Sequence, residues 1–249
     1  MGRSTLHNNE DKDRTADGVE HAPAGLTAPP ALPRPRPVRD AVVAVVLALA
    51  AAGGLVAAFT GVGPAQADAQ LLDESVEARS SGLTALAVAV TNIGGTVAMA
   101  VLAVAVAVWC WYVGRRADAV LAIAAMGGGF ALFDGLKNLL NRPRPPVDNR
   151  LVAVANESLP SGHATMSIIV VGTIVVLAWP GRGTAARVAM VAVAAAWVIA
   201  VGLTRVYLGV HWFSDVLAGW LVGGAWLAVC VTVWSWWRSR RLVTETSGG

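Results

Sequence analysis

Charged residues are scarce in this sequence of 249 residues. Only 14% of the residues are Asp, Glu, Lys or Arg, whereas 55% are hydrophobic. No charged residue occurs between Arg79 and Arg115. A transmembrane helix needs about 20 apolar residues, so this stretch alone is long enough to cross a bilayer. The composition argues against a soluble globular protein and predicts an integral membrane protein.

Cysteine is almost absent, and so are groups of residues that could hold a metal. Cys110 and Cys230 both lie inside apolar runs, where a free thiol packs as a small hydrophobic residue. Neither has the cationic surroundings of a reactive thiolate, and we expect no disulfide between them. No carboxylates, histidines or cysteines are spaced as ligands of a catalytic metal, so we expect no metal or other cofactor. The net charge of +3 comes from basic residues at the ends of apolar runs, which is typical of membrane topology rather than of nucleic-acid binding.

The apolar runs predict an all-α polytopic membrane protein, a bundle of six transmembrane helices. Their hydrophobicity is continuous rather than alternating, which favours helices over barrel strands. The expected spans are residues 41–62, 83–112, 119–136, 164–179, 187–204 and 212–236. We expect residues 39–241 to form this membrane domain.

The two ends of the chain are polar. Residues 1–38 are rich in Pro, Ala and charge, which predicts a disordered cytoplasmic tail, and residues 242–249 are expected to be a cytoplasmic C-terminal tail. The small-residue pattern Ala65-Gln66-Ala67 after the first apolar run is of the signal-peptidase kind. The length of that run favours an uncleaved first span over a cleaved signal peptide.

The basic residues predict the orientation. With the N-terminus in the cytoplasm, one side receives Arg34, Arg36, Arg39, Arg115, Arg116, Arg182, Arg187, Arg238, Arg240 and Arg241. The other side receives an acidic segment, residues 68–77. The loop 137–163 carries four basic residues on this outer side, against the positive-inside rule. Such a cluster indicates a binding role, although a single cation there would be read as a snorkelling interface charge.

Two of three polar stretches on that side suit the binding of an anion. In KNLLNRPRP, Lys137 and Arg144 supply cations, and the planar guanidinium of arginine matches phosphate oxygens. In PSGH, Ser161, Gly162 and His163 open a helix, where free backbone N–H groups and the helix dipole favour an anion. Alone, PSGH could equally be an ordinary helix N-cap.

The third stretch, TRVYLGVHWFSD, pairs a histidine with a carboxylate. His211 and Asp215 are four residues apart, so we expect them to share one helical face. The carboxylate can accept the proton of one ring nitrogen and leave the other as an attacking lone pair. Arg205, six residues before His211, adds a further cation. A satisfied interfacial His–Asp pair is the alternative for this stretch alone.

Together these motifs resemble the three-part signature of the type 2 phosphatidic acid phosphatase (PAP2) superfamily. The pattern runs Lys137-x6-Arg144-Pro145, then Pro160 to His163, then Arg205-x5-His211-x3-Asp215. The six-span layout, with motifs flanking spans three to six, extends the resemblance over the membrane domain. Thr204 stands where the family commonly has serine, and both residues carry a hydroxyl.

The resemblance implies a metal-independent phosphatase that works through a phosphohistidine. His211 would attack phosphorus, Asp215 would orient it, and His163 would protonate the leaving group and then activate water. The phosphate oxygens would be held by Lys137, Arg144, Ser161, Gly162 and Arg205.

The expected substrate is a lipid phosphate or diphosphate at the extracytoplasmic face: phosphatidic acid, phosphatidylglycerol phosphate or a polyprenyl diphosphate. The Ala- and Val-rich composition is typical of bacteria, so we expect a multi-pass plasma-membrane protein whose partners are the membrane and its lipid substrate, with no nucleic acid. Three alternatives stay open: a lipid or sugar phosphotransferase on the same scaffold, a vanadate haloperoxidase, and a non-catalytic anionic-lipid-binding or transport protein.

Overall fold

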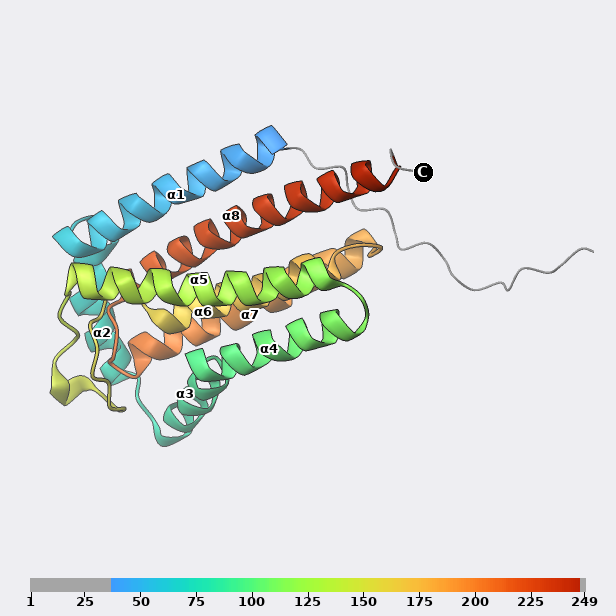
Figure 1. The fold of residues 1–249 in the computed structure, drawn as a ribbon. Helices are drawn as coiled ribbons and strands as arrows, with labels where there is room; N and C mark the ends of the chain where they lie inside the picture. Colours follow the sequence, from blue (N-terminus) through green and yellow to red (C-terminus); the bar gives the residue numbers. More distant parts are fainter. Residues whose placement is uncertain (1–36, 247–249) are drawn as a thin grey trace, which may run out of the picture. The chain divides into compact units, whose positions relative to one another are not determined.

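The computed structural model describes the backbone of residues 37–246 and the side chains of residues 38–240. The expected N-terminal tail therefore lies outside the described residues, apart from its last two residues. The described residues are helical, with no β-strand among them (Figure 1). This confirms the all-α class that the apolar runs predicted.

Eight α-helices and two short 3₁₀ helices follow one another along the described chain. They are α1 (Pro37–Thr60), η1 (Gly63–Ala67), α2 (Asp68–Glu77), α3 (Ser81–Ile93), α4 (Thr96–Tyr112), α5 (Arg116–Leu140), η2 (Val147–Asn149), α6 (Gly162–Ala178), α7 (Thr184–Tyr207) and α8 (Phe213–Thr246). The acidic segment expected as a loop is largely helix α2. The backbone of α8 continues into the segment expected as a C-terminal tail.

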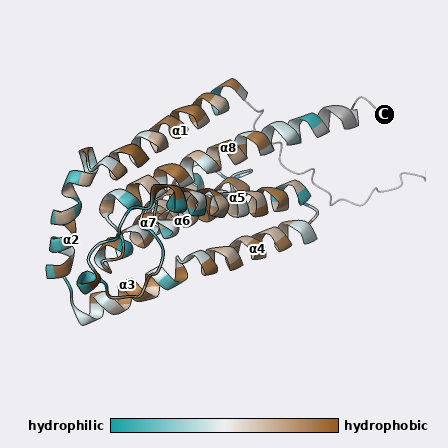
Figure 2. Cartoon of the chain, turned by 60° about the vertical axis from the view of Figure 1, so that its left-hand side comes forward, coloured by the Kyte–Doolittle hydropathy of each residue, from teal (hydrophilic) through white to brown (hydrophobic). Residues whose placement is uncertain are grey.

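Four of the described helical segments, containing α1, α5, α7 and α8, are long and apolar enough to cross a membrane. The expected span 83–112 is two helices, α3 and α4, bent by 42° at their junction, and together they would make a fifth span. Helix α6 has 17 residues, so it is about 25 Å long, shorter than the roughly 30 Å hydrocarbon core. Figure 2 shows hydrophobic colours along α1, α4 and α5. The count of six full spans therefore stays a prediction.

Helix α6 is the central helix of the bundle and contacts α4, α5, α7 and α8, whereas α1 packs along α8 (Figure 1). Its close contact with α8 depends on two glycines. A Cβ at Gly219 would lie 2.8 Å from the Ser161 carbonyl oxygen, and one at Gly223 would lie 2.2 Å from Ile168 Cγ2. Small residues at these positions let the two backbones approach closely.

The bend between α3 and α4 also depends on glycine. Gly94 and Gly95 separate the two helices, and a Cβ at Gly94 would lie 2.3 Å from a methyl group of Val201 on α7. The bend thus allows the end of α3 to approach the last turns of α7. There Thr91 accepts a hydrogen bond from Arg205, 2.7 Å between Oγ1 and Nη1.

Candidate active site

The three polar stretches meet at one end of the bundle. The end of α5, the start of α6, the end of α7 and the start of α8 carry Lys137, His163, Arg205 and Asp215 respectively. Helices α5, α7 and α8 each pack against the central α6. Successive helices run in opposite directions, so these ends lie on one side (Figure 1). The chain topology therefore brings together motifs that are far apart in the sequence.

His211 and Asp215 form a pair, although not on one helical face. His211 lies in the turn before α8, and Asp215 lies in its first turn. Nδ1 of His211 is 3.4 Å from Oδ2 of Asp215. The same oxygen accepts the backbone N–H of Trp212 at 3.0 Å, as the acidic residue of a capping box does. The expectation of a shared helical face was wrong because the carboxylate caps the helix start and contacts the histidine ahead of it.

The second ring nitrogen of His211 faces a cation. Arg144 Nη1 lies 3.1 Å from Nε2 of His211, and a guanidinium can only donate. The contact therefore requires an unprotonated Nε2 and puts the ring proton on Nδ1, beside Asp215. Burial lowers the pKa of His211 to about 3, which keeps the ring neutral at neutral pH. Nε2 thus carries the lone pair that a nucleophile needs.

Three cations of the site have only uncharged partners. The Lys137 ammonium donates to the carbonyl oxygens of Glu157 and Ser158. Arg144 donates to Asn156 Oδ1 at 2.7 Å and to the Val210 carbonyl. Among residues 38–240, no salt bridge involves Lys137, Arg144 or Arg205. Lys137 and Arg205 are almost fully buried. Within the described residues, this end of the bundle thus holds three cations without a salt bridge, and the carboxylates of Asp215 and Glu157 act on Lys137 and Arg144 only from longer range.

Two buried donors at the same place have no hydrogen-bond partner in the described part of the chain. They are the Ser161 hydroxyl and Nε of Arg205. Ser161 occupies the N-cap position of α6, but its side chain makes no capping bond. Native proteins rarely leave buried polar groups unpaired. The N-cap explanation of PSGH therefore does not account for Ser161, whereas an anion would satisfy both donors.

His163 lies in the first turn of α6 and is half-buried. Arg205, Arg144 and Lys137 are all close enough to act on its charge, and Arg144 and Lys137 act on His211 as well. The two histidines thus share cationic neighbours. A Cβ at Gly95 would lie 3.4 Å from Nε2 of His163, so this ring nitrogen faces the bend between α3 and α4.

Gly162 has a packing role beside its backbone N–H. A Cβ there would lie 3.0 Å from the ring of Phe133 on α5. Glycine at this position lets the start of α6 sit close to α5, near the end of that helix that carries Lys137.

The motif spacing did not identify four residues of the site. Arg142 contacts Oδ1 of Asp215, and Ser158 contacts Oδ2. Asp68 pairs with Arg142 at 2.8 Å, and Asn156 binds Arg144. The sequence offered a signal for Arg142 alone, because it is one of the four basic residues in the outer loop 137–163 that run against the positive-inside rule. The others join the site through tertiary packing.

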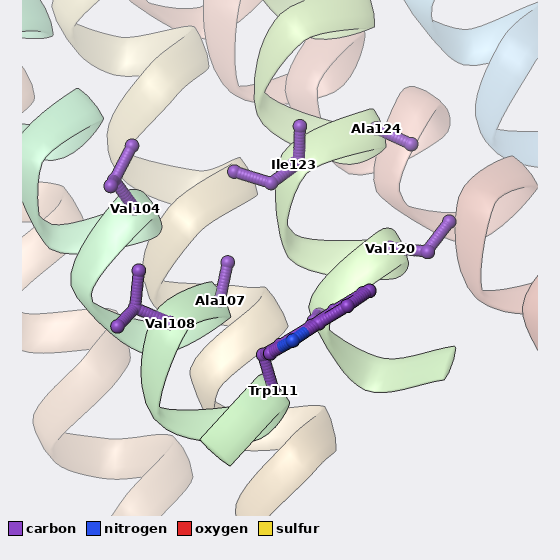
Figure 3. Close-up of a pocket in the computed structure, with 8 residues that line it drawn as sticks. Val104, Ala107, Val108, Trp111, Val120, Ile123 and Ala124 are labelled. Atoms are coloured by element: carbon purple, nitrogen blue, oxygen red, sulfur yellow. The ribbon is translucent and has the colours of Figure 1, made fainter. Parts of the chain in front are cut away.

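A groove of about 440 Å³ between α4 and α5 has no comparable chemistry. Valine, alanine, isoleucine and tryptophan side chains line it, including Val104, Trp111 and Ile123 (Figure 3). Lys137 lies more than a dozen residues further along α5, roughly 20 Å away at 1.5 Å per residue. The apolar lining of the groove suits contact with lipid chains rather than catalysis.

Comparisons with known proteins point to one family of phosphatases. Residues 118–239 match the PAP2 superfamily. A protein of Escherichia coli (strain K12) named as a candidate undecaprenyl-diphosphatase is 32% identical over 124 residues, which cover 48% of this chain and 59% of that protein. Phosphatidylglycerophosphatase B of Bacillus subtilis (strain 168) is 28% identical, with 63% of this chain and 78% of that protein covered.

Two crystal structures have a similar fold. One is a transmembrane PAP2-type phosphatidylglycerolphosphate phosphatase from Bacillus subtilis, with a TM-score of 0.57 and 24% identity, covering 79% of this chain and 94% of that one. The other is LpxE from Aquifex aeolicus, with a TM-score of 0.53 and 23% identity, covering 66% of this chain and 94% of that one. At these identities the likeness concerns the fold.

Proposed function

We propose that the chain, whose residues 118–239 match the PAP2 superfamily, is a membrane phosphatase that hydrolyses a lipid phosphate or diphosphate. The observation that carries the proposal is the unbalanced positive charge around a neutral histidine. Lys137, Arg144 and Arg205 have no carboxylate partner within residues 38–240. Buried charge is costly unless it is paired, and a phosphate group supplies the missing anion.

The phosphate would be bound by the donors that have weak partners or none. Nε of Arg205 and the Ser161 hydroxyl are unpaired, and the N–H groups of the first turn of α6 point to the same end of the helix. Lys137 and Arg144 would exchange neutral oxygens for phosphate oxygens, since a negatively charged acceptor adds the attraction of opposite charges to the hydrogen bond. These donors surround the three equatorial oxygens, where charge is spread in the transition state of phosphoryl transfer.

In the first step, Nε2 of His211 attacks phosphorus and the bond from phosphorus to the lipid oxygen breaks. Arg144 must leave Nε2 for this attack, and a phosphate oxygen gives its guanidinium a charged partner instead. Asp215 accepts a hydrogen bond from the Nδ1–H group of His211, which keeps its proton, and the carboxylate stabilises the positive charge that develops on the ring. Burial and the neighbouring cations lower the pKa of His163, and the negative charge of the bound phosphate opposes this effect, so that His163 is protonated in the complex and gives its proton to the leaving oxygen.

In the second step, water cleaves the phosphohistidine. His163, now neutral, takes a proton from the attacking water, the bond between phosphorus and Nε2 breaks, and inorganic phosphate leaves. His211 recovers its neutral form with the proton on Nδ1. Both histidines then have the protonation states with which the cycle began.

We place the site at the extracytoplasmic face. The helix ends away from it carry seven arginines, Arg39, Arg115, Arg116, Arg182, Arg187, Arg238 and Arg240, and such a bias supports a cytoplasmic location for those ends. Substrate lipids would then be hydrolysed in the outer leaflet of a bacterial plasma membrane.

The test is phosphate release by the purified protein in detergent. Phosphatidylglycerol phosphate, undecaprenyl diphosphate and short-chain phosphatidic acid should be compared, because the relatives are named for the first two. His211→Ala should abolish release, and His163→Ala should slow it by roughly two to four orders of magnitude, as loss of a general acid does. Near-normal hydrolysis by His211→Ala would refute the assignment. Phosphate recovered on an added alcohol acceptor instead of in solution would identify a phosphotransferase.

A further inference from the structure

A second buried carboxylate, Asp68, lies behind Asp215 and is joined to it by one arginine. Arg142 donates from Nη2 to Oδ2 of Asp68 at 2.8 Å, and its Nη1 contacts Oδ1 of Asp215. Asp68 is only 4% exposed, and Asp215 is fully buried. One guanidinium thus bridges two carboxylates that belong to different helices, α2 and α8.

Ser214 completes this network. Its backbone N–H donates to Oδ1 of Asp68 at 2.8 Å, and its hydroxyl donates to Oδ2 of Asp68. The same hydroxyl accepts from Nη1 of Arg142 at 2.8 Å. Asp68 therefore holds the first turn of α8 from outside the helix, where a negative charge is favoured by the helix dipole.

The consequence for Asp215 is that one of its two oxygens is committed. Arg142 contacts Oδ1, which leaves Oδ2 to the Ser158 hydroxyl, the backbone N–H of Trp212 and Nδ1 of His211. Rotation of the carboxylate would break the contact with Arg142. The face that Asp215 presents to His211 is thereby fixed.

We infer that Asp68 and Arg142 are positioning residues, which hold Asp215 so that it orients His211. The inference rests on the proposed function. It assigns a part in catalysis to Asp68 on α2, which precedes the segment 118–239 that matches the family. The side chains of Asp68 and Arg142 bond to each other, to Ser214 and to Asp215, so their loss should lower turnover more than binding.

Asp68→Asn is the principal test, because asparagine keeps an acceptor for Ser214 but presents an amide to Arg142. The matched control is Asp73→Asn, the same change at an exposed carboxylate of the same helix. We expect Asp68→Asn to lower kcat roughly 10- to 100-fold, as loss of groups that orient catalytic residues does. KM should change less than about twofold, and Asp73→Asn should behave as the unchanged protein.

Arg142→Lys is the second test, because an ammonium cannot bridge two carboxylates with a planar fork. Its control is Arg150→Lys in the same loop, since Arg150 donates to the Pro145 carbonyl and not to a carboxylate. Arg142→Lys should also lower kcat at near-constant KM and slow the formation of the phosphohistidine in rapid-quench experiments. Combined with Asp68→Asn, it should lower kcat little further, because groups that act through one another are not additive.

Three results would overturn the inference. One is unchanged kcat in Asp68→Asn while His211→Ala is inactive, which leaves the proposed function intact. Another is a kcat loss in the double variant equal to the product of the single losses. The third is a melting temperature in detergent that falls below the assay temperature in both single variants, which would make the network purely structural. Activity retained by His211→Ala would instead refute the proposed function itself.

Discussion

Replacing Ser161 by alanine should affect activity and stability in opposite directions. The Ser161 hydroxyl is fully buried and has no partner among the described residues. An unsatisfied buried polar group costs about 1–3 kcal/mol, and alanine removes that group at the cost of a small void. The free energy of unfolding of Ser161→Ala should therefore stay constant or rise by up to about 1 kcal/mol.

The effect on catalysis follows from the proposed contact with phosphate. A hydrogen bond to a charged group contributes about 1.5–3 kcal/mol, and each 1.36 kcal/mol is a factor of ten in rate. Loss of this donor should lower kcat/KM by roughly 10- to 150-fold. A gain in stability with a loss of activity is the trade-off typical of a functional residue that folding does not need.

Ser167→Ala is the matched control, because Ser167 is a buried serine of the same helix with a satisfied hydroxyl. Its Oγ donates to the Ala164 carbonyl at 3.1 Å. This variant should lose about 1 kcal/mol or less of stability and keep its kcat/KM. Thermal unfolding in detergent and phosphate release from one lipid substrate measure both quantities. Decreased stability with unchanged activity in Ser161→Ala would refute the reasoning.

Four further predictions concern pH, packing, the general acid and metals. Burial lowers the pKa of His211 to about 3, against 6.5 for an ordinary histidine. The neutral His211 ring therefore contributes its full share to the free energy of unfolding above about pH 6.5, and this contribution is lost as the pH falls towards 3. His211→Asn should flatten this pH dependence when unfolding is measured at several pH values. Gly223→Ala places a methyl group 2.2 Å from Ile168 Cγ2 and should cost about 1–3 kcal/mol by overpacking, seen as a lower melting temperature. Gly95→Ala places a methyl group 3.4 Å from Nε2 of His163. It should lower kcat at least several-fold, with a smaller effect on the melting temperature. A kcat equal to that of the unchanged protein would show that the leaving group does not use this side of the His163 ring. EDTA should leave phosphate release intact, because the proposed phosphate ligands are cations and hydroxyls, and loss of activity restored by added magnesium would contradict the mechanism.

The sequence could predict which helix ends meet, because apolar runs and charge-free stretches define helices and their order. The positions of Lys137, Arg205 and Asp215 relative to those ends follow from counting residues. What it could not predict are contacts that depend on how loops and helices pack. Asp68 looked like one of several acids in an outer segment, and Ser158 has no pattern of its own, yet both reach the surroundings of Asp215.

At helix ends and bends, the local geometry of the structure also differs from what the sequence predicted. The charge-free stretch 80–114 contains no signal strong enough to place a 42° bend, although the Gly94-Gly95 pair marks it in retrospect. Similarly, the four-residue spacing of His211 and Asp215 suggested a helical face, whereas the helix begins between them. Hydropathy is averaged over a window of about 20 residues, so it cannot locate a bend or a helix start that is set by two or three residues.

The bundle also has a buried charge cluster at its opposite end, and the two clusters differ in whether their charges are paired. There the fully buried Asp118 is paired with Arg115 at 2.5 Å and Arg238 at 2.8 Å, and accepts from the Trp234 indole at 3.1 Å. The Asp118 carboxylate has its partners, and both arginines reach solvent in part, so the cluster can hold α5 and α8 together without a ligand. At the site end, Lys137 and Arg205 are buried without a salt bridge, and two buried donors have no hydrogen-bond partner in the described part of the chain. The Asp118 cluster has all its charged partners and is structural, whereas the cluster at the site lacks partners that a substrate phosphate would supply.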